Sequence, residues 1–168
     1  MTRDFTIRKH VHESARTFED VVGAFEAAVG SVEGGEYEHE LGAAQDASDF
    51  ETRLRSREGT SGFMRFQTID HGAWLSALGI RAGAKARLYT IGNPLIARTM
   101  IRHDLGVGLN VPVRVLIYED PASGATRLAY DLPSSLMSGP GNADVDAAAR
   151  KLDAKLVALA EAATGSSA

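Results

Sequence analysis

The sequence predicts an α+β domain in which about five strands form a mixed, largely antiparallel sheet with helices packed on it. Two observations lead to this class. Segments with strand-like and helix-like spacing of apolar residues follow one another with unequal connections, and the last two strands are joined only by the turn at Asp120–Gly124. That short turn predicts an antiparallel hairpin, which a doubly wound parallel sheet would not contain. We expect the first, third and last helices to cover the sheet.

The first strand is expected over residues 5–11, where apolar and polar side chains alternate. This alternation predicts a half-buried strand, with His10 and His12 on its polar, solvent-facing side. A helix should follow, with Thr17 as its N-cap and an end near Gly30. The apolar residues of that helix recur at helical spacing: Phe18, Val21, Val22, Phe25 and Val29.

Residues 31–61 are predicted to form an insertion within the domain. The segment begins acidic, contains Gly34-Gly35, becomes basic after residue 52, and has few large apolar residues. Residues 49–58 are compatible with a short surface helix because Glu51 and Arg55 are four residues apart. Two interpretations remain open, a mobile surface excursion and a lid over a binding site.

The second strand is expected over residues 63–69, with Asp70 as the N-cap of a short helix over 71–78. A third strand then ends at Gly92-Asn93-Pro94, where Asn93 suits the N-cap of a new helix and Pro94 its first position. The first turn of a helix presents free N–H groups and the positive end of the helix dipole. An anion could bind there, or Asn93 and water could satisfy the cap alone.

The fourth strand is expected over residues 111–119, whose nearly continuous apolar run predicts a central strand buried on both faces. Residues 126–132 supply the fifth strand. The last helix should run from Asn142 or Asp144 to about Ala163. We therefore expect one domain over residues 1–163 and a disordered tail over 164–168.

Composition restricts the classes of partner and site. The formal net charge of -4 argues against nucleic acid and a membrane surface as partners, since both favour an excess of Lys and Arg. The absence of cysteine excludes disulfides, thiolate metal sites and a Cys nucleophile. The first ten residues carry charges where a secretion signal would be apolar, so a cytoplasmic location is expected.

Four motifs carry a resemblance to a known family: Ile69–Ala73 after a strand, Leu88–Pro94 with its Gly-Asn-Pro turn, Pro112–Asp120, and Tyr130–Pro133. In this order and spacing the chain resembles the DUF302 family, whose fold is also called TT1751-like. The resemblance implies a small α+β domain of bacteria and archaea, often dimeric, with no established biochemical activity. In that family the first helix runs almost directly into the second strand, which marks residues 31–61 as the insertion.

His71 is the titratable residue of most interest, because it follows Asp70 at a strand-to-helix turn. If its strand neighbours the one that ends at Asn93, the imidazole faces the Gly-Asn-Pro turn. It would then act as a general acid or base oriented by Asp70 or Asp131, as a metal ligand, or as a donor to an anion. The alternative is a structural His71 that hydrogen-bonds and orders its own turn.

Metal and haem sites receive little support. His10 and His12 share one face of the first strand, but two ligands do not make a site, and no third ligand can be placed near them. His71 or His103 is a conceivable axial haem ligand, although no attachment motif is present. No metal site is predicted, and the cofactor is left unknown.

The candidate ligand-binding residues are His71, Asn93, Asp70, Tyr89, Arg65 and Arg98. Arg65, Phe66, Arg87 and Tyr89 either line a pocket for an acidic ligand or are core aromatics beside solvated arginines. Our first hypothesis is a non-catalytic binder of a small anionic or amphipathic molecule near His71, Asn93 and the helix at Pro94. The alternatives are an enzyme that uses His71 as general acid or base, and a homodimer that interacts through its sheet or last helix.

Overall fold

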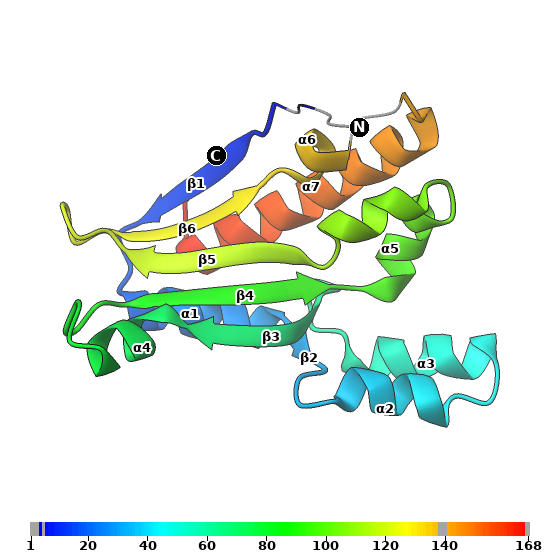
Figure 1. Cartoon of the computed structure of the whole chain (residues 1–168), viewed down its shortest axis with the longest axis horizontal. Coiled ribbons are helices and arrows are strands. Elements are labelled where there is room, and N and C mark those ends of the chain that lie inside the picture. Colours follow the sequence, from blue (N-terminus) through cyan, green and yellow to red (C-terminus); the bar gives the residue numbers. More distant parts are fainter. Residues whose placement is uncertain (1–3, 5, 138–140, 167–168) are drawn as a thin grey trace.

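The computed structural model describes residues 4, 6–137 and 141–166. Within them, six strands form one mixed sheet in the order β1-β6-β5-β4-β3-β2 (Figure 1). All neighbouring strands are antiparallel except β2 and β3, which are parallel. The strands are β1 (Lys9–Ser14), β2 (Gly30–Ser31), β3 (Met64–Asp70), β4 (Ala86–Gly92), β5 (Val113–Glu119) and β6 (Thr126–Asp131). The α+β class and the largely antiparallel sheet are confirmed, and the additional strand, β2, is too short to show any alternation.

Helices α1 (Phe18–Ala28) and α7 (Ala143–Thr164) cover one face of the sheet and lie behind it in Figure 1. Helix α1 begins at the predicted cap, where Thr17 accepts a hydrogen bond from the N–H of Asp20. Of the two predicted starts of α7, Asn142 is the cap, and it accepts from two N–H groups. The core lies between these helices and the strands, and its fully buried members include Phe25, Tyr89, Ile91, Ile117, Leu128 and Leu156. The fold is therefore built on a one-sided core.

The opposite face of the sheet is uncovered at its centre. Figure 1 shows no helix of the described residues across the middle of β6, β5 and β4 on this side. On β5, Val115 and Ile117 are buried, whereas Arg114 is exposed and Leu116 is partly exposed. The prediction that this strand is buried on both faces is therefore wrong, because its apolar run continues onto the uncovered face, where Leu116 stays partly exposed.

Strand β1 presents the opposite face from the one predicted. His10 and His12 point toward the helices because they pair in register with Tyr130 and Leu128 of β6. His12 is 9% exposed, while Val11 on the other face is 50% exposed. The strand also starts later than predicted, at Lys9, and Phe5 lies outside the described residues. The prediction that His12 faces solvent is therefore wrong.

Residues 31–61 form a helical hairpin, α2 (Glu36–Ala43) and α3 (Ala47–Arg57). Helix α3 overlaps the surface helix predicted over residues 49–58 but begins two residues earlier and ends at Arg57, and Asp46 caps it by accepting a hydrogen bond from the N–H of Asp49. Leu54 of α3 is fully buried in a small second core with Val32 and Met64. This apolar contact anchors the hairpin to β3.

Four short helices complete the described chain: α4 (His71–Ala77), α5 (Pro94–Ile101), the 3-10 helix η1 (Leu105–Asn110) and α6 (Pro133–Met137). The caps predicted for α4 and α5 are present at Asp70 and Asn93. Helix α5, the third helix of the predicted order, follows the end of β4 and packs against α7 and η1. It therefore closes one end of the sheet, which corrects the expectation that it covers the face.

The end of α7 extends into the predicted tail. Thr164 is the last helical residue, and its carbonyl oxygen accepts a 2.6 Å hydrogen bond from the hydroxyl of Ser14. The predicted disordered tail over residues 164–168 is therefore wrong for Thr164, which is helical. Residues 167–168 lie outside the described chain. Among the described residues, no helix combines the length and the apolar character needed to cross a membrane.

Candidate functional site

The turn between β4 and α5 has the predicted form but no free donors. The side-chain oxygen of Asn93 accepts a 2.8 Å hydrogen bond from the N–H of Leu95. The N–H groups of Ile96 and Ala97 both donate to the carbonyl oxygen of Asn93, at 3.0 and 2.8 Å, and proline at the first helical position has no N–H. The turn is satisfied by Asn93 itself, so it offers an anion no unused N–H group.

A pocket of about 510 Å³ lies beside this turn, within the range of small-molecule sites. It is formed where the end of β4, the start of β5, α5 and α7 meet the α2 end of the hairpin. Its walls are mostly apolar and include Phe63, Phe66, Ile91, Ile96, Met100, Ile101, Val111, Pro112 and Leu152. Such a lining favours the apolar part of a ligand.

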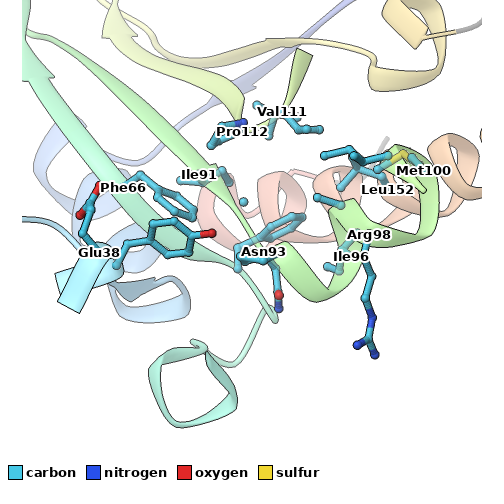
Figure 2. A pocket seen from close by; sticks show the side chains of 17 residues that line it. Glu38, Phe66, Ile91, Asn93, Ile96, Arg98, Met100, Val111, Pro112 and Leu152 are labelled. Carbon is cyan, nitrogen blue, oxygen red and sulfur yellow. The ribbon is translucent and has the colours of Figure 1, made fainter. Parts of the chain in front are cut away.

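Four polar side chains also line the pocket, and two of them are already engaged elsewhere. The Asn93 amide nitrogen donates to the Glu58 carboxylate and to the carbonyl oxygen of Gly62, both at 2.9 Å. Arg98 contacts the carboxylate of Glu51 at 3.0 Å, and Figure 2 shows its side chain extending away from the apolar lining.

The other two polar groups of the pocket come from α2. Among the described residues, the hydroxyl of Tyr37 and the carboxylate of Glu38 have no hydrogen-bond partner. Burial raises the pKa of the Tyr37 hydroxyl, and the neighbouring Glu38 charge raises it further. The polar edge of the pocket therefore consists of a neutral hydroxyl and a carboxylate.

Ion pairs hold the hairpin that carries this edge. The carboxylate of Glu40, on α2, accepts hydrogen bonds from Arg53 at 3.1 Å and from Arg57 at 2.7 Å, both on α3. Hydrogen bonds from Arg57 and Arg53 lower the pKa of Glu40, so the carboxylate stays ionised. The Glu51 to Arg98 pair then ties α3 to α5. The hairpin contributes Tyr37 and Glu38 to the pocket lining, and these ion pairs hold it against α5.

His71 does not face Asn93. Strands β3 and β4 are neighbours, as expected, but they are antiparallel, with Asp70 opposite Arg87 and Met64 opposite Gly92. His71 and Asn93 therefore lie at opposite ends of the strand pair, and the predicted juxtaposition is wrong. The indole nitrogen of Trp74 donates a 2.9 Å hydrogen bond to Nδ1 of His71, within helix α4. This contact matches the structural alternative for His71.

Neither proposed carboxylate orients His71. Asp70 accepts the capping bond from the N–H of Ala73 with one oxygen and pairs with Arg87 through the other, at 3.3 Å. Asp131 lies on β6 and pairs with Lys9 of the edge strand β1. A general acid or base assisted by either residue has no support from these positions.

Arg65, Tyr89 and Asp70 belong to a separate network on the helix-covered side. The Tyr89 hydroxyl donates a 2.7 Å hydrogen bond to Glu26, and Arg65 contacts the same carboxylate at 3.3 Å. Arg65 also pairs with Glu33 at 2.7 Å. Burial raises the pKa of Tyr89 above its ordinary value, and the hydrogen bond to Glu26 adds to this shift. These arginine charges are balanced inside the protein, which disfavours an external acidic ligand at this position.

The two histidines of β1 pack against Tyr130. Nε2 of His12 lies 3.3 Å from the Tyr130 hydroxyl, and the His10 and His12 rings are 6.2 Å apart. Burial lowers the pKa of His12, the His10 charge lowers it further, and Glu161 opposes the shift. In the part of the chain that the structure describes, no group of three or more His, Asp or Glu side chains could hold a metal ion.

The structure divides the six candidate residues into three places. Asn93 and Arg98 lie at the pocket, Arg65, Tyr89 and Asp70 lie around Glu26 and Arg87, and His71 stands apart on α4. The sequence analysis missed Tyr37, Met100 and Leu152 as pocket residues. They come from three distant helices, and only their apolar or aromatic character signals a shared cavity.

The comparisons with known proteins agree with this fold. The family described as "Domain of unknown function DUF302" matches residues 37–163. A solved structure, the crystal structure of an uncharacterized conserved DUF302 protein from Bacillus stearothermophilus, is similar with a TM-score of 0.66 at 14% sequence identity. The similarity covers 92% of this chain and 97% of that one. No curated protein matches. The chain therefore belongs to the DUF302 family, a family of unknown function.

Proposed function

We propose that the protein is a non-catalytic binder of a small amphipathic molecule, held in the pocket beside α5. One observation carries the proposal: a mostly apolar cavity of about 510 Å³ has its only unengaged polar side chains, among the described residues, on α2. An apolar body would fill the cavity, and a polar end would meet Tyr37 and Glu38. Burying the apolar body supplies the affinity, at roughly 25 cal/mol for each Å² removed from water.

The charge of the polar end follows from the groups around it. In Figure 2, Glu38 and Phe66 lie at one end of the lining, and Met100 and Leu152 lie at the other. A carboxylate at the polar end attracts a cation and repels an anion. The ligand is therefore proposed to have a neutral or positively charged head, which narrows the predicted choice between an anionic and an amphipathic molecule.

A fluorescent apolar probe tests the pocket directly. Titration with 1-N-phenylnaphthylamine should show saturable binding to the wild-type protein. Ala97 lines the pocket, so Ala97→Phe should fill part of it and weaken binding about tenfold, since 1.4 kcal/mol corresponds to a factor of ten. Thr99→Phe places the same ring at an exposed position of α5 and should bind as the wild type does. Equal binding by both variants, or no binding to the wild type, would reject the pocket.

Two further probes test the head group. Octylammonium and octanoate have equal chain lengths and opposite charges near neutral pH. Octylammonium should displace the fluorescent probe more strongly, and Glu38→Gln should remove that preference without removing probe binding. A preference for octanoate in the wild type would contradict the proposed head group.

The enzyme and homodimer hypotheses do not involve the pocket beside α5. The enzyme hypothesis lacks a carboxylate partner for His71, and the cytoplasmic location remains a prediction. The homodimer implied by the resemblance is a second proposal, and its support lies on the uncovered face of the sheet.

A further inference from the structure

Two aromatic rings meet at the polar end of the pocket beside α5. Tyr37 of α2 and Phe66 of β3 both line the cavity, with their ring centroids 5.2 Å apart and their planes at 64°. Rings inclined in this way form two sides of a corner, and we refer to the pair as the aromatic corner. Both side chains are partly exposed, so part of each ring is available to a ligand in the cavity.

Packing holds the aromatic corner in place. The Tyr37 ring also lies 6.4 Å from the ring of Phe50, on α3. All three rings pack against the small second core that contains Leu54. Contacts of this kind order the rings before a ligand arrives, which lowers the entropy cost of binding.

The charge beside the aromatic corner is negative. Glu38 lies at the same end of the lining as Phe66 (Figure 2), and its carboxylate has no ion pair among the described residues. Arg98 is the basic residue of the lining, but it pairs with Glu51. The face of an aromatic ring is also electron-rich and attracts a cation. The rings and the carboxylate therefore favour a positively charged group at the same place.

Hydrogen-bond acceptors at this end of the pocket are few. The side-chain oxygen of Asn93 already accepts from the N–H of Leu95, which leaves the Tyr37 hydroxyl and the Glu38 carboxylate among the polar side chains of the lining. Both belong to one helix, and adjacent helix residues do not face each other. A primary ammonium has three N–H donors, and burial is costly unless they are satisfied. A quaternary ammonium has no N–H and needs no acceptor.

We propose that the aromatic corner and Glu38 bind a quaternary ammonium head, so that the ligand of the pocket is an amphiphile with a trimethylammonium group. This inference rests on the proposed function, because the apolar chain of the ligand occupies the same cavity. The methyl groups pack against the ring faces, which attract the positive charge. The Glu38 carboxylate adds a Coulombic attraction that needs no directional hydrogen bond.

Displacement of 1-N-phenylnaphthylamine by two cations of equal chain length tests the head group. In the wild type, octyltrimethylammonium should displace the probe at about a fivefold lower concentration than octylammonium. Tyr37→Leu removes one ring but keeps an apolar side chain, and it should abolish this preference. Tyr37→Phe keeps the ring and should keep the preference. The three additional methyl groups add apolar area in every variant, so this pair of variants isolates the effect of the ring.

Two more variants complete the test. Phe66→Leu removes the other ring and should act as Tyr37→Leu does, so the result does not depend on the folding of one variant. Glu38→Gln should weaken both cations and leave their ratio unchanged. Equal displacement by the two cations in the wild type, or a preference that survives in both leucine variants, would overturn this inference while the probe still binds. A wild type that binds no probe would reject the proposed function, and this inference with it.

Discussion

The hydroxyl of Tyr89, on β4, donates a 2.7 Å hydrogen bond to the carboxylate of Glu26, on α1. The Tyr89 side chain is fully buried, and the two residues connect the sheet to the helix that covers it. Arg65 contacts the same carboxylate, at 3.3 Å. The Glu26 carboxylate therefore forms a polar link between the two layers of the fold.

Removing the Tyr89 hydroxyl should destabilise the protein modestly. Tyr89→Phe keeps the buried ring and loses one hydrogen bond to a charged acceptor, which costs about 1–2 kcal/mol in free energy of unfolding. Urea unfolding near neutral pH measures the change. Tyr37→Phe is the control, because the Tyr37 hydroxyl has no hydrogen-bond partner among the described residues. Equal losses in the two variants would contradict a specific role for the Glu26 contact.

Alkaline pH should destabilise the fold through its buried tyrosines. Burial raises the pKa of Tyr130 from 10.0 to about 12, and the charges of Asp153 and Glu161 contribute. Above pH 10 the unfolded chain therefore releases protons that the folded chain retains, and the free energy of unfolding falls as pH rises. Absorbance at about 295 nm follows tyrosine ionisation, and Tyr130→Phe should remove a transition near pH 12. If that transition persists in the variant, the assignment to Tyr130 is wrong.

Mild acid should destabilise the fold through His12. Its pKa in the folded state is lowered from 6.5, chiefly by burial, so below that value the unfolded chain binds more protons than the folded chain. The free energy of unfolding should therefore fall between about pH 7 and pH 5. His12→Gln should reduce this slope in urea unfolding, and His39→Gln, exposed on α2, controls for the loss of one histidine. Equal slopes in the two variants would refute the prediction.

The α2–α3 hairpin should open when Glu40 loses its charge. Glu40→Gln weakens the hydrogen bonds to Arg53 and Arg57 and leaves two arginines without their shared carboxylate. Limited trypsin digestion should then cut faster within residues 36–57 while the sheet stays intact. Glu38→Gln, also on α2 but without an ion pair among the described residues, should be cut at the wild-type rate. Unchanged cleavage of Glu40→Gln would show that apolar contacts alone hold the hairpin.

Local signals in the sequence predicted the elements well. The caps predicted at Thr17, Asp70 and Asn93 are all present, because a side-chain oxygen at the start of a helix satisfies nearby N–H groups whatever surrounds it. The β5–β6 hairpin is also present, since its short turn allows only antiparallel pairing. These features depend on residues close together in the chain.

The candidate site was harder to predict because it depends on distant residues. An antiparallel pairing of β3 and β4 separates His71 from Asn93, and no local pattern gives the direction of pairing. The pairing of β1 with β6 likewise turned His12 inward and Val11 outward. The pocket combines side chains from α2, α5 and α7, whose contact follows from packing of the whole domain.

Because the core lies on one side of the sheet, the positions of each strand fall into two groups that tolerate substitution to different degrees. Side chains that alternate toward α1 and α7, such as Val115 and Ile117, are fixed by folding, because a change there leaves a cavity or a clash. Outward side chains such as Leu88 and Leu116 lie on the uncovered face and are partly exposed, so substitutions there should cost less stability. Among related chains, the inward set should keep its volume through divergence. The residues of the outward set should vary more between related proteins, according to whether each protein uses this face to bind a partner.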